Sequence, residues 1–341
     1  MLGALATLPP QLRMRVEGEF GLDEVVWCGN RSCVMESEKK FVLRKVVLLR
    51  VLVFAFCVPV FFVFGSDSVD LDNYSEAYEK GWYQFGPAFN LLMLLFKAAD
   101  LPFVSLWFFL GFLISVLFSV IYSRYELILF AAPNIFFLLS GSYSTQLRFS
   151  LGSLFFVYLY GQKSRVLIFF SSMIHLSMLI PLVLRFSLDR YFRCCSSILC
   201  LRNLSFLLAL AGFVLLSYYF STILMGMLGY SHYIDSKHLA PKSISSVLYI
   251  VISLALVSYI LIYVGDQTSY RRYVCFALGI LLCCICYSGY AMVSGRLLML
   301  YFLFEPFVMS HMFRSVRKNG LGWLFIVVVV AFQLSKFGAM V

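Results

Sequence analysis

Charge is scarce in this chain of 341 residues, and that scarcity excludes a water-soluble globular protein. Only 13% of the residues are charged and 62% are hydrophobic, and the mean hydropathy is +0.90. A soluble domain of average composition is about half apolar and about a quarter charged. Apolar stretches of the roughly 20 residues that cross a bilayer recur from Val46 to the C-terminus. The composition therefore predicts an all-α polytopic membrane protein.

The signatures of two common kinds of chemistry are missing as well. No phosphate-binding loop of the Gly-x-x-x-x-Gly-Lys-Ser/Thr type is present, so the sequence indicates no ATP site. The ten cysteines lie mostly in or beside apolar stretches, as small core residues do, and we expect no metal site. The net charge of +10 comes from basic residues scattered among loops, which is typical of membrane orientation. We therefore predict no metal, no cofactor and no nucleic-acid partner.

The N-terminal residues are more polar than the rest of the chain. They end in a basic cluster of Lys39, Lys40, Arg44 and Lys45, which is typical of the cytoplasmic flank of a membrane helix. We predict a cytoplasmic N-terminal head over residues 1–45 and a single polytopic membrane domain over residues 46–341.

The number of membrane crossings depends on two segments, 86–97 and 166–185. The first is short, and 10–14 apolar residues are more typical of a re-entrant or interfacial segment. The second is long enough to cross but carries polar residues and a proline in its middle. The sequence predicts about nine helices if both are re-entrant and about eleven if both cross. The clear spans lie near residues 46–64, 102–122, 126–142, 147–161, 203–224, 244–264, 273–291, 296–313 and 320–335.

Basic residues favour the arrangement with two re-entrant segments. That arrangement leaves fewer basic residues outside the cell between positions 86 and 185. It also places Arg148 on the same face as the loop of residues 65–84.

This loop combines carboxylates with aromatic rings. Carboxylates suit proton transfer, and aromatic rings can stack on sugars. The acids are Asp67, Asp70, Asp72, Glu76 and Glu79, and the aromatic residues are Tyr74, Tyr78, Trp82 and Tyr83. A solvated connection between two membrane helices is the alternative interpretation.

Three further residues carry charge or can titrate close to apolar spans. Arg148 follows the hydroxyl-rich stretch SGSYSTQL, Arg296 lies at the outer end of a span, and His175 lies in the middle of residues 166–185. A guanidinium presents a planar fork that matches phosphate oxygens. An ionisable residue inside a membrane segment indicates a functional site. Arginines that anchor helix ends and a hydrogen-bonded core histidine are the alternatives.

Two arginines and a carboxylate on one membrane face suit a substrate with a pyrophosphate leaving group and a hydroxyl nucleophile. The arginines would stabilise the departing pyrophosphate as charge develops on it. A carboxylate would take the proton of the attacking hydroxyl. Because arginines can neutralise this charge without a metal, we predict a metal-independent reaction.

The order of these features resembles the EpsG-like family of exopolysaccharide and O-antigen polymerases, the Wzy type. The resemblance spans residues 46–310 and rests on Asp72-Asn73-Tyr74 with Tyr78, Gly86 with Asn90, Tyr143 with Gln146 and Arg148, His175 with Ser177, and Arg296 with Tyr301. The family often has an acid shortly before the glycine at the end of the loop, whereas this chain has Gln84-Phe85-Gly86. This departure moves the expected base to Asp72.

The resemblance implies an enzyme of the bacterial inner membrane that joins oligosaccharide repeat units carried on undecaprenyl pyrophosphate, at the periplasmic face. It implies Asp72 as the base, with Glu76 and His175 in reserve. Arg148 and Arg296 would bind the pyrophosphate. The expected sugar contacts are Tyr74, Tyr78, Trp82, Tyr83, Gln146 and Tyr301. The expected partners are the lipid-linked oligosaccharide, the lipid bilayer, a chain-length regulator and a flippase.

Other function classes fit parts of the pattern. A lipid-linked sugar flippase or transporter would line a central cavity with charges, whereas the ionisable residues here lie mainly at helix ends. Another membrane transferase of surface polysaccharide, either a ligase or an acetyltransferase, is the second alternative. A ligase would normally carry a large outer loop late in the chain, and residues 225–243 form only a short one.

Overall fold

The computed structural model shows a helical protein. It describes residues 32–65, 69–82, 85–162, 167–194, 212, 244–263, 268–288, 291–316 and 320–338. These ranges contain helices and turns and no strand, which confirms the all-α fold class. The expected span near residues 203–224 and the side chain of Tyr83 lie outside the described part. By contacts, the chain divides into a unit of residues 1–48 and a unit of residues 49–341, and the functional residues discussed below belong to the second.

Among the residues that the structure describes, three helices are long and apolar enough to cross a membrane. They are residues Lys45–Gly65 of α1 (Ser32–Gly65), α4 (Phe103–Ile121), and residues Met292–Phe313 of α13 (Ala291–Val316). A helix rises about 1.5 Å per residue, so about 20 residues cover the hydrocarbon core. The other helices are α2 (Val69–Lys80), α3 (Pro87–Ala98), α5 (Tyr125–Leu138), α6 (Leu147–Gly161), α7 (Phe170–Ile174), α8 (Leu179–Cys194), α11 (Ile244–Tyr263), α12 (Thr268–Cys286) and α14 (Gly320–Gly338).

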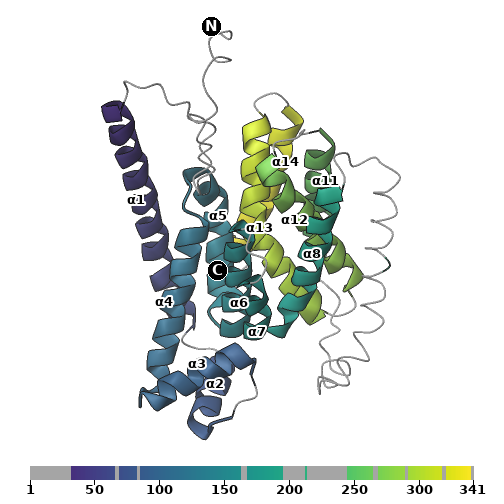
Figure 1. The fold of residues 1–341 in the computed structure, drawn as a ribbon. Helices are drawn as coiled ribbons and strands as arrows, with labels where there is room; N and C mark the ends of the chain where they lie inside the picture. Colours follow the sequence, from purple (N-terminus) through teal and green to yellow (C-terminus); the bar gives the residue numbers. More distant parts are fainter. Residues whose placement is uncertain are drawn as a thin grey trace. The chain divides into compact units, whose positions relative to one another are not determined.

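The two short helices α2 and α3 lie together at the lower end of α4 in Figure 1. At about 18 Å long, α3 is too short to cross a bilayer. The ammonium of Lys97 in α3 donates to the carbonyl oxygens of Tyr78 and Glu79, which end α2. The hydroxyl of Tyr78 donates to the carbonyl of Leu101 at 2.6 Å, just before α4. These bonds hold α2, α3 and α4 together at this end.

The chain returns to the same end through α5, and α6 then leaves it. A π-helical turn, Leu139–Tyr143, continues α5 before α6 begins. The hydroxyl of Ser150 donates to the carbonyl oxygen of Tyr143, and the hydroxyls of Tyr143 and Ser153 lie 2.6 Å apart. The hydroxyl-rich stretch thus fixes the turn that places Arg148 in the first turn of α6.

Residues 167–194 form an interrupted hairpin. Two 3-10 turns, Leu167–Phe169 and Leu176–Met178, flank α7, and α8 follows. The chain turns at His175, close to the start of α3. α8 then packs against α12, and a guanidinium nitrogen of its Arg185 lies 3.5 Å from the carbonyl oxygen of Leu159, near the end of α6. Residues 167–185 therefore do not form one continuous helix, and the re-entrant path stays a prediction.

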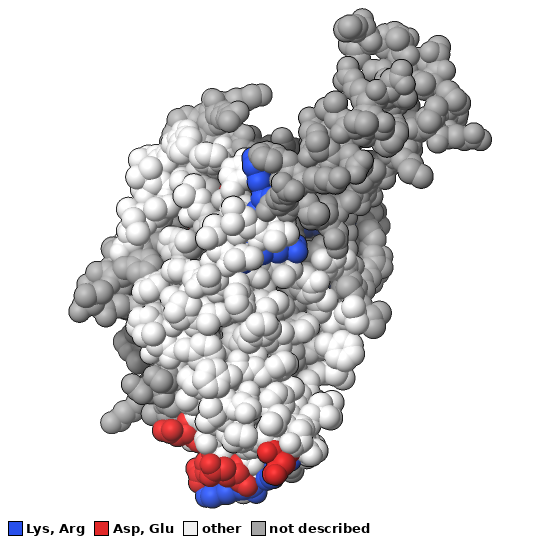
Figure 2. All heavy atoms as spheres, turned by 90° about the vertical axis from the view of Figure 1, so that its left-hand side faces the viewer, with Lys and Arg blue, Asp and Glu red and all other residues white. Residues whose placement is uncertain are grey.

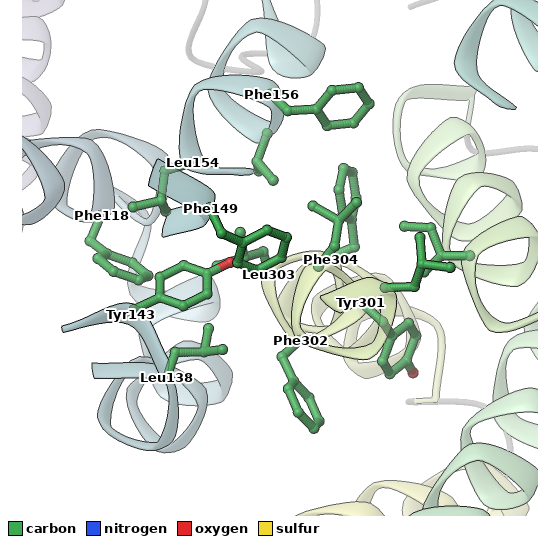
Figure 3. Close-up of a cluster of buried hydrophobic side chains, with 14 of the residues drawn as sticks. Phe118, Leu138, Tyr143, Phe149, Leu154, Phe156, Tyr301, Phe302, Leu303 and Phe304 are labelled. Carbon is green, nitrogen blue, oxygen red and sulfur yellow. The ribbon is translucent and has the colours of Figure 1, made fainter. Parts of the chain in front are cut away.

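Aromatic and aliphatic side chains from α4, α5, α6 and α13 fill the core between these elements (Figure 3). Phe156 of α6 stacks on Phe276 of α12 with ring centres 5.4 Å apart, and both rings contact Phe304 of α13. α13 packs against α12 and α5 along much of its length. It is the central helix of the described bundle and carries Arg296 near its start.

A group of polar residues lies in the middle of this apolar core. Pro306 has no N–H, so the carbonyl of Phe302 one turn earlier loses its partner in the helix. The side-chain amide of Asn134 in α5 donates to that carbonyl at 3.0 Å and to the carboxylate of Glu305 at 2.8 Å. The hydroxyl of Tyr249 in α11 bonds the other oxygen of the same carboxylate. We call Asn134, Tyr249, Glu305 and Pro306 the interior polar cluster.

On the surface shown in Figure 2, the acidic residues lie at one end and are followed by a wide apolar band. Figure 2 shows acidic residues gathered at one end beside basic ones, with a wide uncharged surface above them. α4 alone exposes Val104, Phe108, Phe109 and Phe112. The exposed charged side chains on α2, α3 and the turn after α3 are Asp70, Asp72, Glu76, Glu79, Lys80, Lys97 and Asp100. This distribution suits a lipid-facing belt with α2 and α3 at one membrane surface.

Candidate functional site

Arg148 lies in the first turn of α6, beside α2 and the start of α3. Its Nε donates a hydrogen bond of 3.1 Å to the hydroxyl of Tyr74, and its guanidinium carbon lies 4.3 Å from the ring centre of Phe85. Such a cation–π contact contributes about 0.5–2 kcal/mol. In the described part of the chain, no hydrogen bond or ion pair occupies its two terminal nitrogens. Arg148 is therefore held at one edge and one face, while the fork that binds phosphate oxygens stays open.

Residues 85–90, which we call the supporting turn, hold the site from two directions. The side chain of Asn90 donates to the carbonyl oxygen of Phe85 at 2.8 Å and accepts from its N–H at 3.2 Å. Gly86 packs against α7 so closely that an added Cβ would lie 2.7 Å from a backbone carbonyl oxygen. The turn thus positions the ring beneath Arg148 and also supports the segment that ends at His175.

His175 and Arg296 meet at the ring of Phe149, the neighbour of Arg148 in α6. The ring centre of Phe149 lies 5.7 Å from that of His175 and 5.9 Å from the guanidinium carbon of Arg296. Both arginines act electrostatically on His175, and Arg296 does so more strongly. The Nδ1 of His175 accepts a hydrogen bond from the backbone N–H of Ser177. The structure thus brings together three residues predicted from the sequence, from α6, the hairpin and α13.

The start of α6 offers further binding groups. Gln146 is its N-cap residue and makes no side-chain capping bond. Its amide oxygen is buried and has no hydrogen-bond partner among the described residues. A buried acceptor without a partner costs about 1–3 kcal/mol, and a sugar hydroxyl could satisfy it. No group of three or more His, Cys, Asp or Glu side chains in the described ranges could hold a metal ion.

The segment expected as a loop contains a helix, α2, and most of its acids face away from Arg148. Side chains two residues apart on a helix point about 160° apart, so Asp72 and Glu76 lie opposite Tyr74. Both acids are exposed, and Glu76 pairs with Lys80. In the described chain neither one bonds Arg148. Asp70, four residues before Tyr74, shares its side of the helix.

Two tyrosines expected to contact sugars are buried instead. Tyr78 is 6% exposed and bonds the backbone before α4; burial and then the charge of Asp100 raise its pKa. Tyr301 is fully buried beside Tyr249, and Figure 3 shows it directed away from Phe149. Neither ring can stack on a sugar in this conformation, and we leave both out of the proposed site.

The other two expected aromatic contacts differ in exposure. Trp82 is 47% exposed, with the ammonium of Lys80 lying 4.6 Å from its ring centre. Tyr74 is buried against Phe85 and Phe89, and it meets Arg148 through its hydroxyl and through its ring, whose centre lies 5.6 Å from the guanidinium carbon. Of the described aromatic residues of this segment, Trp82 is therefore the one whose ring is open to a sugar.

Two residues of the site escape sequence reasoning. Phe149 separates His175 from Arg296, although nothing marks it among the many phenylalanines of the chain. Gly152 lies one turn later in α6, where an added Cβ would lie 3.2 Å from the carbonyl oxygen of Ser171 and 3.3 Å from the Cβ of His175. A glycine inside a helix costs about 1 kcal/mol relative to alanine, so its presence signals a close approach.

Comparison with known proteins points to one family. No curated protein and no solved structure matches the chain significantly. The family model described as the EpsG family matches residues 46–338, a range that contains Tyr74, the supporting turn, Arg148, His175 and Arg296. Because this match covers most of the chain, the protein belongs to the EpsG family.

Proposed function

We propose that this protein joins oligosaccharide units carried on undecaprenyl pyrophosphate, at the periplasmic face of a bacterial inner membrane. Membership of the EpsG family indicates a multi-pass membrane protein of the polysaccharide polymerase type, with a glycosyltransferase-like activity. The lipid pyrophosphate donor, the periplasmic face and a reaction without a metal are parts of the proposal.

The open fork of Arg148 is the observation that carries the proposal. A guanidinium held by its Nε and one face, with its terminal nitrogens unoccupied, is prepared to bind two oxygens of one anion. Arg296 and His175 lie within electrostatic range of each other, and Arg148 within range of His175. Positive charge concentrated at the start of a helix is well suited to a pyrophosphate.

The reaction exchanges one carbon–oxygen bond for another. The bond between the anomeric carbon and the pyrophosphate oxygen breaks, and its electron pair leaves with the pyrophosphate. The hydroxyl of the acceptor sugar forms the new bond to that carbon and loses its proton to a base. Arg148 and Arg296 stabilise the charge that develops on the leaving group. Gln146 and Trp82 contact the sugars.

The base is a carboxylate of α2, and the geometry favours Asp70 over the two acids expected from the sequence. Asp70 lies on the side of α2 that carries Tyr74 and is exposed, whereas Asp72 and Glu76 lie on the opposite side. The roles of Asp72 and Glu76 stay predictions that substitution can test.

The test is polymerisation by the purified protein in lipid vesicles, with undecaprenyl-pyrophosphate-linked oligosaccharide as substrate and chain length measured on a gel. We expect Arg148→Ala to reduce the rate about 100- to 1000-fold, as the loss of one charge-stabilising donor does elsewhere. Arg148→Lys keeps the charge but loses the fork, and should recover only part of the rate. Glu79→Gln, which removes an exposed charge at the same end of the protein, is the control. A normal ladder from Arg148→Ala would overturn the proposal.

A further inference from the structure

The two ring nitrogens of His175 have different environments. Nδ1 accepts the backbone N–H of Ser177 at 3.2 Å and lies 2.7 Å from the Ser177 hydroxyl. A backbone N–H can only donate, so Nδ1 carries no proton. The proton of a neutral imidazole must then be on Nε2. Within the described residues Nε2 makes no hydrogen bond.

The orientation of the ring is fixed by the backbone around it. His175 is extended, with φ −146° and ψ 121°, and is the N-cap of the 3-10 turn that follows. Gly152 of α6 lies against its Cβ, and Gly86 lies against the carbonyls of the two preceding residues. The edge-to-face contact with Phe149 restricts the ring itself. Rotation of the ring would break the hydrogen bonds to Ser177, and no other described residue bonds the ring in their place.

Burial of the ring, and then the charges around it, favour its neutral form. Arg296 and Arg148 both repel a third positive charge at this position. A neutral ring whose proton is on Nε2 is a hydrogen-bond donor at that atom. The same geometry argues against His175 as the reserve base, because Nε2 already holds a proton and Nδ1 is occupied by Ser177.

We infer that His175 donates a hydrogen bond from Nε2 to a phosphate oxygen of the leaving group, and that Ser177 is the positioning residue that keeps the proton on Nε2. The identity of the acceptor rests on the proposed function. As the bond to the anomeric carbon breaks, the electron pair moves onto the pyrophosphate, and the hydrogen bond from Nε2–H to the phosphate oxygen shortens. The proton stays on His175, while the proton of the acceptor hydroxyl goes to the carboxylate base.

The first experiment determines where the proton is. The full-length protein is labelled with ¹⁵N-histidine, and the ring nitrogens are observed by NMR in lipid nanodiscs, with the His175 signals identified by their loss in His175→Gln. We expect a protonated Nε2 and an unprotonated Nδ1, and a weaker preference for the same tautomer in Ser177→Ala, which loses the hydroxyl but keeps the backbone donor. Addition of inorganic pyrophosphate should shift the Nε2 signal more than the Nδ1 signal. A proton on Nδ1, or a doubly protonated ring, would overturn the inference.

The second experiment separates donation from proton acceptance. Glutamine can place a donating N–H near the position of Nε2, asparagine near that of Nδ1, and neither amide is a base. We expect His175→Ala and His175→Asn to lose about 100-fold in rate and His175→Gln to lose roughly 10-fold or less. If His175 were a base, all three variants would lose the same large factor. Ser177→Thr, which keeps both donors to Nδ1, should preserve the full preference for the wild-type tautomer, whereas Ser177→Ala, which keeps only the backbone donor, should weaken it.

The two ideas can fail independently. The tautomer is read from the protein without substrate, so it stands or falls whatever reaction the protein performs. An active Arg148→Ala protein with His175 protonated on Nε2 would remove the proposed function and keep the tautomer. An inactive Arg148→Ala protein with His175 protonated on Nδ1 would keep the proposed function and remove the inference.

Discussion

The candidate site and the interior polar cluster both contain buried polar groups, but they differ in whether those groups have hydrogen-bond partners. At the site, the terminal nitrogens of Arg148, the amide oxygen of Gln146 and Nε2 of His175 have no partner in the described chain. In the interior cluster, both oxygens of Glu305 accept hydrogen bonds, and Asn134 donates to two acceptors. The site is prepared for a ligand, whereas the cluster is complete without one.

This difference shows how to interpret polar residues in a membrane protein. Their presence inside an apolar span marks them as expensive, but does not distinguish function from architecture. Whether each polar atom already has a hydrogen-bond partner distinguishes the two. A carboxylate with two donors holds helices together, and an arginine with an unoccupied fork is available for chemistry. Substitutions should therefore reduce activity on one side of the comparison and stability on the other.

The largest of these effects should come from Asp70, one of the acids of α2. We expect Asp70→Asn to reduce the polymerisation rate by at least about 100-fold, as the loss of a general base does, with unchanged thermal unfolding. Asp72→Asn and Glu76→Gln should remain close to the wild-type rate because both acids lie on the opposite side of the helix. The reverse result would return the role of the base to Asp72.

Gly86→Ala should break the site without touching a reacting group. The added Cβ would lie 2.7 and 2.9 Å from the carbonyl oxygens of Met173 and Ile174, so the segment before His175 must move. A misplacement of about 1 Å costs about 100-fold in rate. Gly295→Ala is the control, because its added Cβ has no atom within 4 Å. Equal rates for the two variants would show that the supporting turn does not position His175.

Glu305→Leu should act on stability. It removes the carboxylate that accepts from the Tyr249 hydroxyl and from the side-chain amide of Asn134, at about 1–3 kcal/mol for each buried group. We expect the free energy of unfolding in detergent to fall by about 3 kcal/mol, while the rate per folded molecule changes little. Ser310→Ala removes only a longer bond of 3.4 Å from the same helix and serves as the control. A loss of activity in stable Glu305→Leu protein would place the interior cluster in the reaction.

The smallest effect is a coupling between Asn134 and Pro306. Asn134→Leu removes the side-chain donor to the carbonyl of Phe302, but Pro306→Ala supplies a backbone N–H that can bond it within the helix. The double variant should therefore lose less stability than the sum of the two single variants, by about 1 kcal/mol. Additive losses would mean that Asn134 does not compensate for the proline.

Much of the arrangement could be predicted from the sequence because it depends on length and local pattern. The apolar spans indicate the fold class, the shortness of residues 86–97 indicates a helix that does not cross, and the polar residues around His175 indicate an interruption. Basic residues favoured the arrangement in which Arg148 lies beside the acidic segment. The structure places it there through its bond to Tyr74.

The differences between the sequence-based expectation and the structure have two causes. Residues 69–80 form the helix α2 rather than a loop, and the sequence does contain its signal: Leu71, Tyr74 and Tyr78 recur at helical spacing and acids occupy the first turn. The burial of Tyr301 and the pairing of Asn134 with Glu305, in contrast, have no local signal in the sequence. Partners 171 residues apart meet only because α5 packs on α13, and no local pattern contains that information.

The supporting turn positions two groups of the site at once. Its aromatic ring lies against the guanidinium that would hold the leaving group, and its glycine lies against the backbone that presents the imidazole. Any displacement of this turn would loosen both groups at once, so intermediate states with one group in place and the other lost are disfavoured. Substrate affinity and the rate of the chemical step should consequently vary together across substitutions in residues 85–90, and a variant that separates them should be found elsewhere in the chain.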